Sequence, residues 1–324
     1  MENKEYEQFV EEYKNTLQQY LNQGADQVEI VRTRTSKVNA DGGKDGLIIK
    51  YSDSNVSPTI YLDQPYERFR AGEAVGDIVA QVQRSIELAR RDVPLIPEIN
   101  AEMAKKNLFA ALINPEKNAD LLKNVPYKKF NDLAIIARCA VSDDASFIVN
   151  RDNLKALQLM PEEALEIALD NSRKQQYEVR SLTEIMCEEA FPDGMPEEMF
   201  MEPEDFGMPE LYVVSNKKQF DGSIAMACPE VMKNIEKKFG EEFYVLPSSR
   251  HEILALPKSK ATGGYEELES LVREVNATTV EAKDYLSNKV YLYSGRKLQL
   301  AETLEKELVK EQVPVQQITR ARAM

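Results

Sequence analysis

The chain of 324 residues is long enough for one large domain or two of ordinary size, and its 43% hydrophobic and 30% charged residues can form sizeable cores. The net charge of −14 argues against direct nucleic-acid binding, which needs clustered Lys and Arg, and against docking on an anionic membrane. No apolar leader precedes the first charged helix, and no apolar run approaches the roughly 18 residues of a membrane span. We therefore expect a cytoplasmic protein.

The N-terminal part predicts a helix, a three-stranded meander and a second helix. The expected elements are a helix over 6–21, strands over 28–38, 47–51 and 59–62, and a helix over 66–91. Gly24 is expected to end the first helix, and the glycine-rich stretch 41–46 is typical of a hairpin turn. Pro94 and Pro97 mark a joint. The first unit is therefore expected over residues 1–92.

The rest of the chain, residues 99–324, predicts a larger mixed-sheet region. Strands are expected over 107–113, 133–141, 147–149, 211–214, 224–227, 243–246, 253–256 and 290–293, and helices from 161, over 229–239, over 265–275 and over 298–309. Pro161 and Pro229 suit the first turn of a helix, where the missing N–H has no intrahelical partner to lose, and Gly240 suits a helix end. The fold class is therefore α+β: an N-terminal helix–three-stranded meander–helix unit followed by a larger mixed α/β-sheet region.

Cysteine and histidine usage limits the chemistry. Cys139, Cys187 and Cys228 form no C-x-x-C pair, which argues against thiol-redox and structural zinc motifs, and their apolar neighbours indicate buried, inert thiols. His251 is the single histidine, which excludes metal sites and acid–base mechanisms that need two. We expect no metal and no cofactor.

Residues 191–210 form a segment, here called the acidic methionine segment, that is rich in Met, Pro and carboxylates and holds no Lys or Arg. The carboxylates taken as candidate binding residues are Glu197, Glu198, Glu202, Glu204 and Asp205. Met side chains adapt to apolar partners and carboxylates attract basic ones, so one interpretation is a docking loop. The other is a solvated loop whose methionines pack on the core. A calcium site is disfavoured, because the spacing does not match an EF-hand.

A polar cluster lies between two apolar strands at residues 248–252. Ser248 or Ser249 could act as a nucleophile with His251 as its base and Glu252 or a distant acid orienting the ring. Adjacent strand residues point to opposite faces, however, and no G-x-S-x-G elbow is present. The structural alternative is that the serines form turn hydrogen bonds while Arg250, also a candidate binding residue, pairs with a carboxylate.

Four stretches give the chain a family resemblance. They are NVSPTIYL at 55–62, LINPEKN at 112–118, DLAII at 132–136 and YVLPSSRHE at 244–252. Across about residues 6–300 the chain resembles the uncharacterised domain-of-unknown-function family 5688 of clostridial and related gut bacteria, although Arg250 stands where an aliphatic residue is more usual. The resemblance implies a bacterial cytoplasmic protein, of a kind whose genes often travel with mobile elements. By analogy it also makes the His251 segment a more attractive site.

Two functional hypotheses follow. The first is a non-enzymatic, mobile-element-associated protein-binding factor that uses its acidic surface on a protein partner, for which a basic partner is the natural match. The alternative is a hydrolase that uses Ser248 or Ser249 with His251. Neither predicts an oligomeric state.

Overall fold

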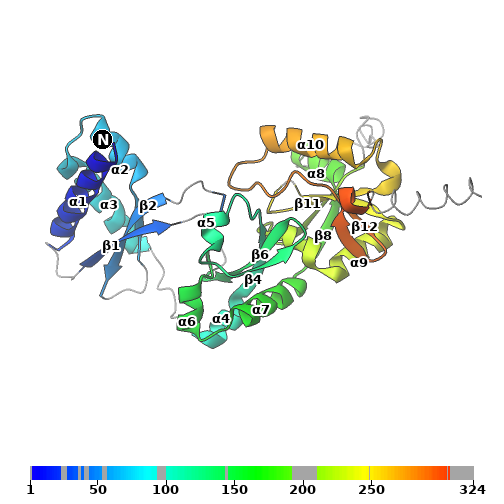
Figure 1. The fold of residues 1–324 in the computed structure, drawn as a ribbon, viewed down its shortest axis with the longest axis horizontal. Coiled ribbons are helices and arrows are strands. Elements are labelled where there is room, and N and C mark those ends of the chain that lie inside the picture. The colour runs from blue at the N-terminus through cyan, green and yellow to red at the C-terminus, as the bar shows by residue number, and fades with distance from the viewer. Residues whose placement is uncertain are drawn as a thin grey trace, which may run out of the picture. The chain divides into compact units, whose positions relative to one another are not determined.

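The computed structural model describes residues 2–22, 28–35, 38–39, 44–52, 57–92, 100–142, 145–191, 210–247, 249–304 and 306 (Figure 1). The chain divides into two compact units, Met1–Glu102 with Val141–Ala145, and Met103–Ala140 with Ser146–Met324. Each described sheet is antiparallel and is accompanied by helices, so the predicted α+β fold is confirmed. In the described part of the chain no helix is both long and apolar enough to cross a membrane.

The first unit contains the predicted helix and strand meander. Its elements are α1 (Glu2–Leu21), β1 (Val28–Thr35), β2 (Lys44–Tyr51), β3 (Thr59–Tyr61), α2 (Asp63–Arg70) and α3 (Val75–Asp92). The sheet has the order β1-β2-β3, with Ile30 opposite Ile49 in the β1–β2 register. The apolar face of the sheet carries Val28 and Ile30, whereas Glu29 between them is exposed, as the two-residue period of a strand requires.

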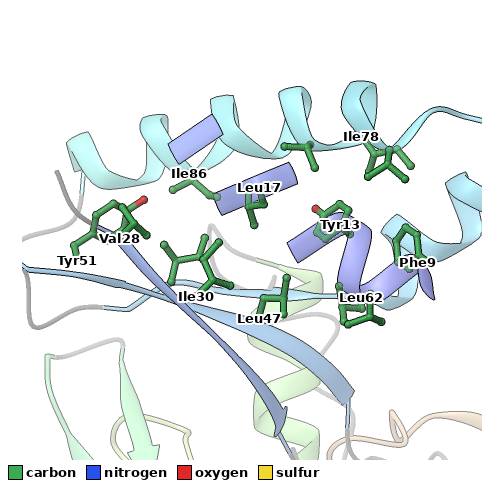
Figure 2. Close-up of a cluster of buried hydrophobic side chains, with 14 residues drawn as sticks. Phe9, Tyr13, Leu17, Val28, Ile30, Leu47, Tyr51, Leu62, Ile78 and Ile86 are labelled. Carbon is green, nitrogen blue, oxygen red and sulfur yellow. The ribbon is translucent and has the colours of Figure 1, made fainter. Parts of the chain in front are cut away.

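Helices α1 and α3 cover that face and build the core of the unit (Figure 2). Tyr13 and Leu17 of α1 pack with Leu47 of the sheet and Ile78 of α3, and all four are fully buried. The spacing of these residues along α1 places them on one helical stripe. The amphipathic pattern of the sequence therefore corresponds to a real two-layer core.

The prediction of a single helix over 66–91 is wrong in one respect, because the segment forms two helices. Helix α2 ends at Arg70, and Gly72 has φ +92°, a conformation that interrupts a right-handed helix and suits glycine. Helix α3 then begins at Val75. The proline joint at 94–97 lies outside the described residues.

The second unit holds two further sheets. Its elements are α4 (Ala101–Asn107, at the boundary), β4 (Leu108–Ile113), α5 (Ala119–Leu122), β5 (Tyr127–Phe130), β6 (Leu133–Ala140), β7 (Ser146–Ile148), α6 (Arg151–Leu157), α7 (Pro161–Arg173), β8 (Tyr177–Ser181), α8 (Leu182–Ala190), β9 (Tyr212–Asn216), the 3-10 helix η3 (Gly222–Ala227), α9 (Pro229–Phe239), β10 (Phe243–Leu246), β11 (Ile253–Pro257), η4 (Lys258–Lys260), α10 (Tyr265–Thr278), β12 (Tyr291–Ser294) and β13 (Lys297–Leu300). Strands β4, β6 and β5 form one sheet in that order, with β7 also paired to β6. The other sheet has the order β13-β12-β10-β11-β9-β8.

Local signals for helix ends are confirmed in this unit. Pro161 and Pro229 both stand in the first turn of their helices, and Gly240 ends α9 in the left-handed conformation. Strands β5, β8 and β13 and helices α4, α5, α6, α8 and η4 were not predicted.

Two predicted elements in this unit are wrong. Residues 224–227 form part of the 3-10 helix η3 rather than a strand, because Asp221 takes a left-handed φ of 51° and turns the buried run into a helical turn. Short apolar runs do not reveal which of these they will become. Residues 298–300 belong to strand β13, paired with β12, and helical structure starts only at Ala301.

Candidate functional site

The candidate site is the connection between β10 and β11, which holds Ser249, Arg250 and His251. Its backbone is attached to the stretch before β12: Ser249 forms a β-bridge with Tyr285, and the Arg250 N–H donates to the Asp284 carbonyl at 2.9 Å. Ser248 lies outside the described residues. The connection is therefore joined to its own two strands and is held in place by a distant part of the chain.

The Ser249 hydroxyl serves this turn. Its Oγ accepts a hydrogen bond from the His251 backbone N–H at 3.0 Å, the local pattern that serine adopts in turns. The Ser249 side chain is buried. In the described structure this hydroxyl is bonded to the His251 backbone and makes no hydrogen bond to the imidazole ring.

Both ring nitrogens of His251 have partners. Nδ1 accepts from the Asp221 backbone N–H at 3.3 Å, and Nε2 lies 3.0 Å from Asp284 Oδ1. An acceptor Nδ1 places the ring proton on Nε2, which then donates to Asp284. Asp284, a distant acid, thus takes the orienting position for which the sequence analysis offered Glu252 or a distant acid, and the ring presents no free nitrogen to a described hydroxyl.

Arg250 belongs to a buried charge cluster, called here the Arg–Asp–Arg cluster, made of Arg138, Asp221 and Arg250. Arg250 Nε and Nη2 both bind Asp221 Oδ1, at 2.8 and 2.6 Å. Arg138 Nε lies 3.3 Å from Asp221 Oδ2. The side chains are 11%, 1% and 10% exposed for Arg138, Asp221 and Arg250. Two guanidinium groups therefore share one carboxylate in a nearly water-free place.

The pairing of Arg138 is incomplete. Arg138 Nη2 donates to Ser146 Oγ at 2.8 Å, but neither Arg138 Nε nor Asp221 Oδ2 has a well-formed hydrogen bond among the described residues. Burial lowers the pKa of the Arg138 guanidinium and nearby Arg250 lowers it further, while Asp221 raises it. With two guanidinium groups and one carboxylate, the cluster carries one more positive than negative charge.

Phe220 lies against both guanidinium groups of the site and against the imidazole ring. Its ring centroid is 5.4 Å from Arg138 Cζ, 5.6 Å from Arg250 Cζ and 5.4 Å from the His251 ring. The two guanidinium distances are within the range of cation–π attraction. Asn216 fixes the Phe220 backbone at both polar atoms, donating to its carbonyl at 2.8 Å and accepting from its N–H at 3.2 Å. Phe220 is nevertheless 39% exposed, so part of the residue that contacts the buried guanidinium groups is accessible to solvent.

The turn that positions Asp221 depends on the backbone conformation of Asp221 and on the tight packing around Gly222. Asp221 is left-handed, a conformation that aspartate tolerates better than most residues. A Cβ on Gly222 would collide with Ser215 Oγ and the His251 carbonyl oxygen. Because the Asp221 N–H is the donor to His251 Nδ1, this turn also determines which tautomer of the imidazole is present.

Sequence reasoning missed Asp221, Asp284 and Arg138 as members of the site. Arg138 was visible as a charge inside the apolar run of β6, and a charge in a buried strand needs a partner. Nothing in the sequence identified that partner as Asp221, because the partner comes from another sheet region. Asp284 lies 33 residues beyond His251 and was equally unmarked.

A second feature concerns the acidic methionine segment. Its carboxylates Glu197, Glu198, Glu202, Glu204 and Asp205 lie outside the described residues, but its surroundings are described. Ser181 and Tyr212 are opposite each other in the β8–β9 register, and the Leu182 N–H donates to the Leu211 carbonyl at 2.8 Å. The chain therefore leaves the sheet at 182 and returns beside the same point at 211.

Helix α8 occupies the start of this connection and has no buried residue. Met186 is 49% exposed and Phe191 36% exposed, while Glu184, Glu188 and Glu189 are exposed on the same short stretch. Helix α8 thus presents apolar and acidic side chains together to solvent.

The remaining predictions about reactive groups divide as follows. Cys139 and Cys228 are buried free thiols, and burial raises the pKa of Cys139 to about 11. Cys187 on α8 is half-buried, so its predicted burial is wrong in degree, because the helix covers no core. Across the described ranges no group of three or more His, Cys, Asp or Glu gathers in a way that would hold a metal ion.

One comparison with known proteins gives a match. The model of a family described as a family of unknown function, DUF5688, matches residues 6–295. No curated protein matches the chain, and no solved structure does.

Proposed function

Because the chain belongs to the DUF5688 family, whose function is unknown, we propose a function from its own residues: a protein-binding factor that docks a basic protein through its acidic surface. The docking surface is helix α8 together with the acidic methionine segment. The proposal includes a cytoplasmic location in a bacterial cell and association with a mobile element.

The observation that carries the proposal is the length of the β8–β9 connection. Ser181 and Tyr212 are register partners in neighbouring antiparallel strands, which a turn of two residues is able to join. The chain instead inserts α8 and the acidic methionine segment between them. Long connections inside compact units are uncommon and are usually functional or linkers. The pairing of β8 with β9 does not require so long a connection.

The composition of the connection fits a basic, partly apolar partner. Residues 182–210 carry ten carboxylates and no Lys or Arg. Such a concentration of one sign steers an oppositely charged partner and raises its association rate. Met186 and Phe191 add exposed apolar surface that a partner would bury, and methionine adapts its shape to different contacts.

The hydrolase alternative has less support. A Ser–His pair needs a hydroxyl hydrogen-bonded to a free ring nitrogen, whereas the nitrogens of His251 bind Asp221 and Asp284. The Ser249 hydroxyl binds backbone instead. The protein-binding proposal requires no rearrangement of this kind.

The test is partner capture with the full-length chain and one variant, followed by binding measurements with the purified partner. Full-length chain and a variant in which 192–209 is replaced by a short Gly-Ser linker are used as bait. A partner captured by the full chain is then purified and titrated at increasing salt. We expect a basic protein that binds the full chain, is lost with the linker variant, and binds more weakly as salt rises.

A control that removes carboxylates elsewhere separates the segment from overall acidity. Substituting Glu266, Glu267 and Glu274 of the exposed face of α10 by Gln removes three charges that lie outside residues 182–210 and is expected to leave binding unchanged. If the linker variant captures the same proteins as the full chain, the proposal fails. Cell fractionation tests the location.

A further inference from the structure

The Arg–Asp–Arg cluster has an unbalanced positive charge in a protein whose net charge is −14. Buried charges are normally paired and hydrogen-bonded, because desolvation is otherwise costly. Arg250 meets this expectation with two bonds to Asp221 Oδ1. Arg138 does not, since its Nε lacks a well-formed acceptor among the described residues.

The two arginine side chains are not wholly sealed from solvent, although Arg138 Nε itself is buried. About a tenth of each guanidinium-bearing side chain remains accessible, and the Phe220 ring that lies against both is 39% exposed. The two arginines come from different elements, β6 and the β10–β11 connection, yet both Cζ atoms lie within 6 Å of the same ring centroid. A ligand at this ring would therefore meet two guanidinium groups at once.

We propose that Arg138, Arg250 and Phe220 form a binding site for a small oxyanion, a carboxylate or phosphate, that carries an aromatic or apolar body. Guanidinium groups recognise carboxylate and phosphate oxygens through paired N–H donors. Asp221 holds both arginines and neutralises one of them, which leaves the charge of the other for the ligand. The ring of Phe220 supplies the apolar contact beside the charge.

The neighbouring charges limit the direction from which an anion can approach. Asp284 is engaged by His251 Nε2 and lies 4.0 Å from Lys283 Nζ, so its charge is partly matched. Asp221 would repel an oxyanion that approached from its own side. The ligand is therefore expected to approach over the exposed edge of Phe220. This site is independent of the acidic docking surface and does not rest on the proposed function.

The experiment is a titration of the full chain followed by the side-chain Nε–H resonances of arginine in ¹H–¹⁵N spectra. The probes are inorganic phosphate, phenyl phosphate and benzoate, each at constant ionic strength with sodium chloride as balance. The Arg138 resonance is assigned by its loss in Arg138→Lys. We expect the Arg138 and Arg250 resonances to move, with phenyl phosphate binding roughly two- to tenfold more tightly than inorganic phosphate. The order of phenyl phosphate and benzoate identifies the preferred oxyanion.

Variants localise the effect. Phe220→Ala, at a partly exposed position, is expected to reduce the affinity for phenyl phosphate to that for inorganic phosphate. Arg138→Lys keeps the charge but not the paired donors and is expected to weaken every probe. Arg273→Gln removes an exposed arginine of α10 and is expected to change nothing.

The wild-type titration and Phe220→Ala decide the matter even if Arg138→Lys fails to fold. The inference is overturned if neither Arg138 nor Arg250 responds to millimolar probe, or if Phe220→Ala leaves the preference for phenyl phosphate intact. A response of equal size at Arg273 would also overturn it, because it would mean general ion screening.

Discussion

Replacing Asp221 by Asn should destabilise the second unit more than any exposed ion-pair change. The substitution keeps the shape of the side chain but removes the negative charge that lies 2.6–3.3 Å from two guanidinium groups. Breaking a buried ion pair by removing one partner costs about 3–5 kcal/mol. Because Asp221 is buried, water screens this loss little. For a unit of this size, each kcal/mol lowers the melting temperature by roughly 2–4 °C, so we expect a fall of about 6–20 °C.

The assay is urea unfolding followed by far-UV circular dichroism, at low and at high salt. Tyrosine fluorescence gives a second probe, because the chain has 14 Tyr and no Trp. The matched control is Asp152→Asn, which breaks an exposed pair with Lys155 at 3.4 Å and should cost less than about 1 kcal/mol. The reasoning is refuted if Asp221→Asn costs no more than this control. It is also refuted if high salt abolishes the difference, since a buried pair is screened only weakly.

Three further outcomes are expected. Gly222→Ala should lower the free energy of unfolding by several kcal/mol, because the new methyl group has no room. Gly76→Ala in α3 meets no atom within 4 Å and should raise the free energy of unfolding by up to about 1 kcal/mol. The midpoints of urea unfolding compare the two variants. A thiol reagent should modify Cys187 much faster than the two buried cysteines, which peptide mass mapping over time will show. Burial alone would raise the pKa of Asp45, but hydrogen bonds led by that from Arg32 lower it, so the stability it contributes is present above pH of about 4 and is lost as pH falls through the folded pKa. Asp45→Asn should therefore flatten the acid side of a pH–stability profile, and an unchanged profile would contradict this attribution.

Several features of the fold followed from local sequence. The apolar stripe of α1, the alternation in β1, and the starts of α7 and α9 at Pro161 and Pro229 all depend on residues within a few positions of each other. Such signals reflect backbone geometry and one-sided burial, which a short stretch determines by itself. Where a short apolar run had no such marker, as at 224–227, the prediction of a strand was wrong.

The candidate site was less predictable. The sequence indicated that residues 248–252 were a polar connection between strands, and that Arg250 would seek a carboxylate. It offered no way to choose Asp221 among the 55 Asp and Glu residues of the chain. The same holds for the pairing of His251 with Asp284 rather than Glu252.

By itself the sequence determined the α+β class, the acidic character, the membership of the family and the positions of most helices and strands in chain order. Only the tertiary structure decided that Arg138, Asp221 and Arg250 share one buried place, that both nitrogens of His251 are engaged, and that the long β8–β9 connection returns to its starting point. The physical reason is the separation in sequence of the residues that interact. Helix and strand formation is governed by neighbours along the chain, whereas a buried ion pair is formed by whichever distant charges the packing brings within a few ångströms, and no short stretch of sequence records that choice.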